Sequence, residues 1–248
     1  MRADLLEAQA CVDWPMSQLP DLSKRLKDWL TRGVTIQKKE LPPPAESNLI
    51  VAVENELLPL YFQAEVGAYI NSIRSGLDVL AMVLVKRHDL KIGEDRVLFP
   101  IAKSKEDFER DGGSARKFVE DLPKLERQLI DHLKPYQGGN EALWALHHLD
   151  IVRKHRRLLN ARLKPIHMSI QGTLAEGDFT PLGGEGSIQV GAETVLGMIK
   201  KGVPPLSVRT SFYVGIDEEG FAAGKPVEAV LAQLASAATY AIKLFDGT

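Results

Sequence analysis

The spacing of hydrophobic residues predicts a chain that is mainly helical in its middle and rich in strands near its C-terminal end. Apolar residues three and four positions apart predict helices over 21–33, 56–87, 114–133, 141–163 and 226–245. The fourth helix is expected to stop at Pro165, and the third to kink or break near Pro123. Asn140 stands where an N-cap is expected, directly before the fourth helix.

Stretches rich in β-branched residues predict strands on both sides of the helical region. Two short strands, 33–41 and 48–55, flank a proline-rich turn and are expected to form a hairpin. Three later stretches lie at 166–177, 187–199 and 205–217. We expect these three to form one antiparallel sheet that the final helix covers. This expectation rests on the alternating positions of one strand, which would share a face that has to be buried: Val208, Thr210, Phe212 and Val214.

These patterns together predict an α+β fold, with a central α-helical bundle packed with an antiparallel β-sheet and a C-terminal helix. The chain has 248 residues, of which 44% are hydrophobic, and this is enough for one sizeable core. We therefore expect a single domain over 1–248. Its helical bundle would occupy 56–163, and its β-sheet portion with the final helix would occupy 33–55 and 164–248.

The composition of the chain limits the cell compartments and the kinds of partner that we expect for the protein. The net charge of −2 does not indicate a nucleic-acid-binding surface over the whole molecule, although a local basic patch stays open. The single cysteine, Cys11, allows no intrachain disulfide and favours a reducing compartment. The first residues lack the apolar run of a signal peptide, and the longest apolar run, 79–85, is too short to span a bilayer. We expect a cytoplasmic protein with no membrane partner, whereas a homodimer stays open.

Polar residues fall among the apolar positions of the helix over 141–163. At about 100° per residue, His148, His155 and Arg156 lie within its apolar arc. A buried guanidinium needs an acceptor, so Arg156 is expected to meet a carboxylate or carbonyl or to reach the surface. The other side of this helix is expected to be solvated, and it carries Asp150, Arg153, Lys154 and Arg157.

The helix over 56–87 carries the best partners for these groups. Its polar side holds Asn71, Arg74, Ser75 and Asp78. Arg74 and Asp78 are four positions apart and can form a surface ion pair. Alternatively, Asp78 or Asn71 meets His155 and Arg156 in a buried network between the two helices. The candidate catalytic residues are His155, Arg156, Arg74 and Asp78, and the candidate binding residues are Asn71, Ser75, Lys154 and His148.

The candidate site residues belong to a longer sequence pattern, which consists of four segments spread over about 90 residues. They are GAYINSIRSGLDVLA (67–81), FPI (99–101), KPYQGG (134–139) and LHHLDIVRKHR (146–156). Together they resemble a family of uncharacterised bacterial and phage proteins with R-S-x-L-D, F-P-I, P-Y-x-G-G and L-D-x-x-x-K-H-R segments. The chain departs from that family where Ala68, Asn71, Val79 and Arg153 replace its Asp, His, His and Asp. The resemblance therefore implies a shared polar network that has lost several members here, and it implies no particular activity.

The helical part also loosely resembles HEPN domains. These are helical bundles, often dimeric, and many cleave RNA without a metal through an R-x4–6-H motif. Arg162 and His167 have this spacing, but Pro165 interrupts the helix between them. In a chain with this many arginines and histidines, about one such match is expected by chance.

No sequence motif indicates a cofactor. The chain has no Walker A, dinucleotide-binding, H-E-x-x-H or G-x-S-x-G motif, and the glycines of 183–186 are more typical of a hairpin. The segment 112–117 is more typical of a helix cap than of an anion site. His147, His148 and Asp150 point in different directions around their helix, so no metal site is expected. Two functions stay open: a non-enzymatic binding or assembly module, and a metal-independent ribonuclease in which His155 is the acid or base and Arg156 with Arg74 stabilises phosphate.

Overall fold

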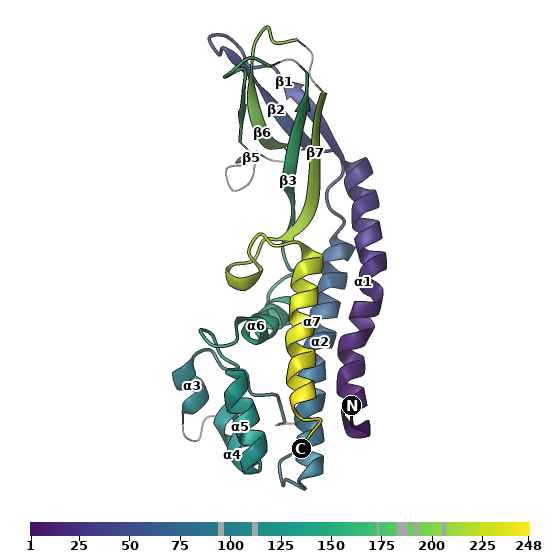
Figure 1. Ribbon diagram of the computed structural model, residues 1–248, viewed down its shortest axis with the longest axis vertical. Coiled ribbons are helices and arrows are strands. Elements are labelled where there is room, and N and C mark those ends of the chain that lie inside the picture. The colour runs from purple at the N-terminus through teal and green to yellow at the C-terminus, as the bar shows by residue number, and fades with distance from the viewer. Residues whose placement is uncertain (94–96, 111–113, 173, 183–187, 191–192, 205–206) are drawn as a thin grey trace. The chain divides into compact units, whose positions relative to one another are not determined.

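The computed structural model describes residues 1–248 except 94–96, 111–113, 173, 183–187, 191–192 and 205–206. It confirms the α+β fold, with helices, two antiparallel sheets and a C-terminal helix (Figure 1). The chain divides into two compact units. A helical unit contains Met1–Pro20, Leu60–Asn160 and Ile216–Thr248, and a strand unit contains Asp21–Pro59 and Ala161–Gly215.

The helical unit is built around three helices that pack against one another. These are α2 (Leu60–Arg87), α6 (Glu141–His155) and α7 (Val227–Leu244). The helices predicted over 56–87 and 141–163 therefore lie side by side within the predicted bundle. The shorter helices are α3 (Lys105–Glu109), α4 (Ser114–Asp121) and α5 (Lys124–Leu133), and Pro123 separates the last two as predicted. The Asn140 side chain accepts a hydrogen bond from the Leu143 N–H at 3.1 Å, which confirms the N-cap.

Helix α6 ends at His155, earlier than the predicted Leu163. Strand β3 (Ala161–Gln171) starts where the predicted helix was still continuing. The apolar residues Leu158 and Leu159 therefore lie in the connection and not on the helix. A helix that continued to Leu163 would include both leucines in its apolar arc. Because the true helix ends before them, its buried side is rotated from the predicted one.

Helix α1 (Leu6–Gly33) starts well before the predicted residue 21 and contains both Pro15 and Pro20. Its residues up to Pro20 belong to the helical unit. There it lies so close to α2 that a Cβ on Gly76 would be 2.8 Å from the Ala8 carbonyl oxygen. The Ser72 hydroxyl also donates to the Cys11 carbonyl at 2.7 Å. This backbone contact fixes the N-terminal half of α1 despite its prolines.

The described residues of the strand unit form two sheets. The larger has the order β1 (Val34–Lys39), β2 (Ser47–Glu54), β6 (Glu193–Lys200) and β4 (Phe179–Pro181), and β5 (Ile188–Val190) also pairs with β6. The predicted hairpin is confirmed, with Ile36 opposite Ala52. The smaller sheet pairs β3 with β7 (Ser207–Ile216).

The prediction that all C-terminal strands form one sheet under the final helix is wrong. Strands β3 and β7 pair with each other, whereas β4, β5 and β6 join the early hairpin. The alternating face of β7 does have cover, because Val208 and Phe212 pack against a core of Ile50, Ala52, Leu196 and Ile199. Helix α7 packs against α2 and α6 instead. Alternation along a strand indicates that one face is buried, but it does not indicate which element covers that face.

One helix in the part of the chain that the structure describes, α2, is long and apolar enough by composition to cross a membrane. Within its most apolar window 56% is buried inside the protein, as in the core helix of a soluble protein.

Candidate functional site

Three contacts set the register between α2 and α6. Along α2, Gly67 lies against the Arg153 side chain, Asn71 bonds to Asp150, and Arg74 bonds to His147. The residue numbers rise on α2 as they fall on α6, so the two helices run antiparallel. This register places Asp78 near the first turn of α6 and His155 near the first turns of α2.

The guanidinium of Arg74 is the centre of the polar network. The residue is 4% exposed, and each of its three side-chain nitrogens donates a hydrogen bond. Nη1 donates to Asp78 Oδ1 at 2.6 Å, Nη2 to the Phe99 carbonyl at 3.2 Å, and Nε to His147 Nδ1 at 3.4 Å. The ion pair predicted from the i, i+4 spacing therefore exists, but its arginine is buried rather than at the surface.

Asp78 and Arg74 together hold the backbone of Phe99. The Asp78 Oδ1 atom accepts the Phe99 N–H at 2.9 Å, while Arg74 donates to the carbonyl of the same residue. The Phe99 side chain is 1% exposed. A segment without regular structure thereby has both backbone polar groups of one buried residue satisfied by α2, as burial requires.

The segment after Phe99 is held in turn by the loop before α6. The Ala102 N–H donates to the Pro135 carbonyl at 3.0 Å, and Ala102 forms a parallel bridge with Tyr136. The loop folds tightly on itself, because a Cβ on Gly139 would lie 2.5 Å from the Lys134 carbonyl oxygen. The four segments of the sequence pattern thus meet in one part of the helical unit.

Asp150 forms a second polar centre, two turns further along α2 from Asp78. It is 4% exposed, although the sequence pattern placed it on the solvated side of the helix, and that expectation is wrong. Asn71 Nδ2 donates to its Oδ1 at 3.1 Å, and Lys154 Nζ lies 2.7 Å from its Oδ2. Arg153 Nη1 is 4.0 Å away. The buried carboxylate is thus compensated by one amide and two cations, as burial of a charge demands.

His147 lies between these two centres and was not among the predicted site residues. Burial and the adjacent Arg74 guanidinium lower its pKa to about 4, against the opposing effects of Asp150 and Asp78. The ring is therefore neutral near pH 7. Because Nδ1 accepts from Arg74, the neutral ring carries its proton on Nε2.

His155 and Arg156 do not join the network, so the expectation that either pairs with Asp78 is wrong. Both are exposed at the C-terminal end of α6. In the antiparallel register they lie about twelve positions from the level of Asp78, or about 18 Å along the helix axis at 1.5 Å per residue. The prediction failed because the sequence does not reveal the direction or register of helix packing.

The remaining predicted residues have varied surroundings. His148 is half-buried and stacks on the Trp144 ring, with centroids 4.8 Å apart, so it is not in the middle of the core. Ser75 is half-buried on α2 beside Arg74. Arg157 forms a bidentate pair with the buried Glu218 at 2.6 and 2.9 Å. The basic run after α6 is thereby partly neutralised.

Some predicted features lie outside the described residues. Arg162 and His167 are both on strand β3, and the side chain of His167 is not described. The glycines at 112–113 and 183–184 are also outside the described residues. Among the residues that are described, no group of three His, Cys, Asp or Glu side chains could hold a metal ion.

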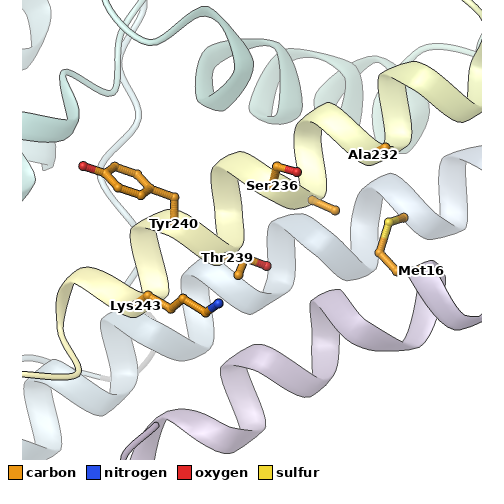
Figure 2. A pocket seen from close by; sticks show the side chains of 7 residues that line it. Met16, Ala232, Ser236, Thr239, Tyr240 and Lys243 are labelled. Carbon is orange, nitrogen blue, oxygen red and sulfur yellow. The ribbon is translucent and has the colours of Figure 1, made fainter.

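A groove of about 440 Å³ lies along the outer side of α7. Figure 2 shows small side chains of α7 along the groove and Met16 of α1 at its border. Its α7 residues are Ala232, Ala235, Ser236, Thr239, Tyr240 and Lys243. Tyr240 is 50% exposed. The small residues of the last helix are the sequence feature that corresponds to this groove. The apolar periodicity of the helix predicts its buried side and does not indicate the groove.

Comparisons with protein-family models, with curated proteins and with solved structures give no match. The candidate function therefore rests on the geometry of the chain itself.

Proposed function

We propose that this protein is a non-enzymatic binding or assembly module whose α2–α6 network keeps its helical unit rigid. The observation that carries the proposal is that all three nitrogens of Arg74 donate to groups of the protein itself. A catalytic arginine needs accessible donors for the transition state, whereas this one is 4% exposed and each of its nitrogens is engaged with Asp78, His147 or Phe99.

The second polar centre supports the same interpretation. Asp150 is buried among Asn71, Lys154 and Arg153, which satisfy its charge internally. His147 is neutral near pH 7 and accepts a proton only in acid, because of its pKa of about 4. These groups stabilise the packing of two helices, and His147 is not poised to transfer a proton at neutral pH.

The HEPN-like ribonuclease remains the alternative, carried by the exposure of His155 and Arg156. Such an enzyme would need a cation beside His155 that binds phosphate in the transition state. Arg74, the predicted partner, contacts His147, which is eight residues and about 12 Å along α6 from His155. The alternative therefore depends on the end of α6 alone, or on a second copy that completes the site.

The groove of α7 is the surface through which we propose that the module assembles, and a second copy is the occupant that it fits. Small side chains such as Ala232 and Ser236 allow another helix to approach closely, and the same helix presents the exposed Tyr240 at the groove edge. A two-fold arrangement would place each Tyr240 in the groove of the other copy, because such interfaces pair the same patch with itself. The resemblance and the single cysteine support a bacterial or phage protein of the cytoplasm.

Two measurements on the full chain test the proposal. First, light scattering coupled to size exclusion should give a dimer that Ala232→Glu converts to a monomer, because the glutamate would be buried unpaired. Ala64→Glu changes an exposed alanine of α2 and should leave the dimer intact. A parent protein that is monomeric at all concentrations would contradict the assembly surface.

Second, the purified parent should not cleave single-stranded RNA in the presence of EDTA. Cleavage by the parent that is lost in both His155→Ala and Arg156→Ala would establish the ribonuclease instead. Both positions are exposed, so these variants are expected to fold as the parent does.

A further inference from the structure

A cavity of about 300 Å³ lies in the strand unit, among residues that the proposed function does not use. Its lining comes from β1, β2, β6 and β7 and from the turn after β6. Ladder pairing places Lys38 opposite Ile50 and Asn48 opposite Ile199. Directly opposed residues project from the same side of a sheet, so these four residues share one face of the larger sheet.

The floor of this cavity is apolar and firmly packed. Ile50 and Ile199 are 4% and 5% exposed and belong to the core of the strand unit. Val208 of β7 packs against the same core and also lines the cavity. A floor made of core residues gives the cavity a fixed shape that an apolar group can fill.

The polar side-chain groups of the cavity lining that remain free to bond are hydrogen-bond donors. Asn48 is 5% exposed, and its Oδ1 atom already accepts the Leu41 N–H at 3.3 Å. This leaves its Nδ2 group as a donor that has no hydrogen bond to a described residue. Nδ2 is not sealed from solvent, so it can donate to a molecule that enters the cavity.

Lys38 adds positive charge on the same face of the sheet, where its contact with the exposed Glu40 at 3.9 Å is weak. Lys200 also borders the cavity, but it follows Ile199 in β6, so its side chain leaves the opposite face of the sheet. Ammonium and amide N–H groups can donate but cannot accept, so the complement of this group of donors is an anion.

We propose that this cavity binds a small amphipathic organic anion, with its carboxylate or phosphate beside Lys38 and the Asn48 amide and its apolar part over Ile50 and Ile199. The volume is at the lower end for ligand cavities, so the ligand is small. The site is in the strand unit, and the inference is independent of the proposed assembly of the helical unit.

The probes are octanoate, octyl phosphate and octanol, titrated into the full chain by isothermal calorimetry. Both anions, or one of them, should bind, and the tighter one identifies the headgroup. Octanol carries the same chain without charge and should bind about tenfold more weakly or not at all, because it forms no charge-assisted hydrogen bonds.

Variants locate the site. Lys38→Met should weaken binding of the preferred anion about tenfold, because it removes one charge-assisted hydrogen bond, and Lys200→Met should weaken it less, because Lys200 leaves the opposite face of the sheet. Both lysines are exposed, so the variants should fold normally. Lys103→Met removes an exposed lysine of the helical unit and should leave the affinity unchanged. No binding of either anion to the parent, equal binding of octanol, or unchanged affinity in both cavity variants would overturn the proposal.

Discussion

Asp78 accepts the backbone N–H of Phe99 at 2.9 Å with the same oxygen that accepts Arg74. This single carboxylate oxygen connects α2 to a segment 21 residues later in the chain. Two segments of the sequence pattern, R-S-x-L-D and F-P-I, therefore contact each other directly. The pattern as a whole describes how a loop is fixed to a helix, which explains why its residues occur together.

Asp78→Ala should lower the free energy of unfolding by about 3 kcal/mol, because it leaves the buried Arg74 guanidinium without its carboxylate. Asp78→Asn should cost less, about 1–2 kcal/mol, because the amide oxygen can still accept hydrogen bonds. Urea unfolding followed by circular dichroism measures both. Asp89→Asn changes an exposed aspartate just after α2 and serves as the control. Equal stability of Asp78→Ala and the parent would show that the network contributes nothing to the fold.

Gly76→Ala should destabilise the attachment of α1 by about 1–3 kcal/mol. The added methyl group would lie 2.8 Å from the Ala8 carbonyl oxygen, and backbone on both helices has little room to move. Limited proteolysis should then cut within 1–20 sooner than in the parent. Gly247→Ala adds a methyl group where nothing lies within 4 Å and should leave both measurements unchanged.

His147 should make the protein less stable in mild acid. Its pKa is about 4 in the folded protein and 6.5 in the unfolded reference, so between these values only the unfolded chain binds the proton. The free energy of unfolding is therefore unaffected above about pH 6.5 and falls as the pH is lowered towards 4. Allowing for partial exposure of the ring, the loss is about 1–2 kcal/mol.

The matched variant for this prediction is His147→Gln, whose amide oxygen can still accept from Arg74. Urea unfolding at pH 7.5 and pH 4.5 should show a smaller loss of stability in the variant than in the parent. An equal loss in both proteins would assign the acid sensitivity to the carboxylates and not to His147.

Glu218→Ala should destabilise the helical unit by about 2–3 kcal/mol. The buried carboxylate binds Arg157 through both oxygens and accepts the Asn160 N–H at 2.8 Å, so its loss leaves a backbone donor without a partner. The control is Glu219→Ala, which changes the exposed neighbouring residue and should have the same melting temperature as the parent. A melting temperature of Glu218→Ala that matches this control would mean that solvent replaces both contacts.

Local sequence patterns located most helices and strands, because helix caps, prolines and hydrophobic periodicity act over a few residues. The Asn140 cap, the break at Pro123 and the hairpin of β1 and β2 were all predicted from such signals. The Arg74–Asp78 pair was also predictable, since its partners are one helical turn apart. The early start of α1 was missed because Pro15 and Pro20 are poor local indicators of a helix that tertiary contacts stabilise.

Tertiary structure alone decided which polar groups meet. The sequence placed His155 and Arg156 inside and Asp150 outside, whereas the end of α6 at His155 and its antiparallel register with α2 reversed both. Asp150 pairs with Asn71, and Arg74 reaches His147 and the backbone of Phe99. These contacts join residues 25 to 79 positions apart in the chain. Hydrophobic periodicity carries no information on helix direction or register at that distance, so only the packed structure could bring these residues together.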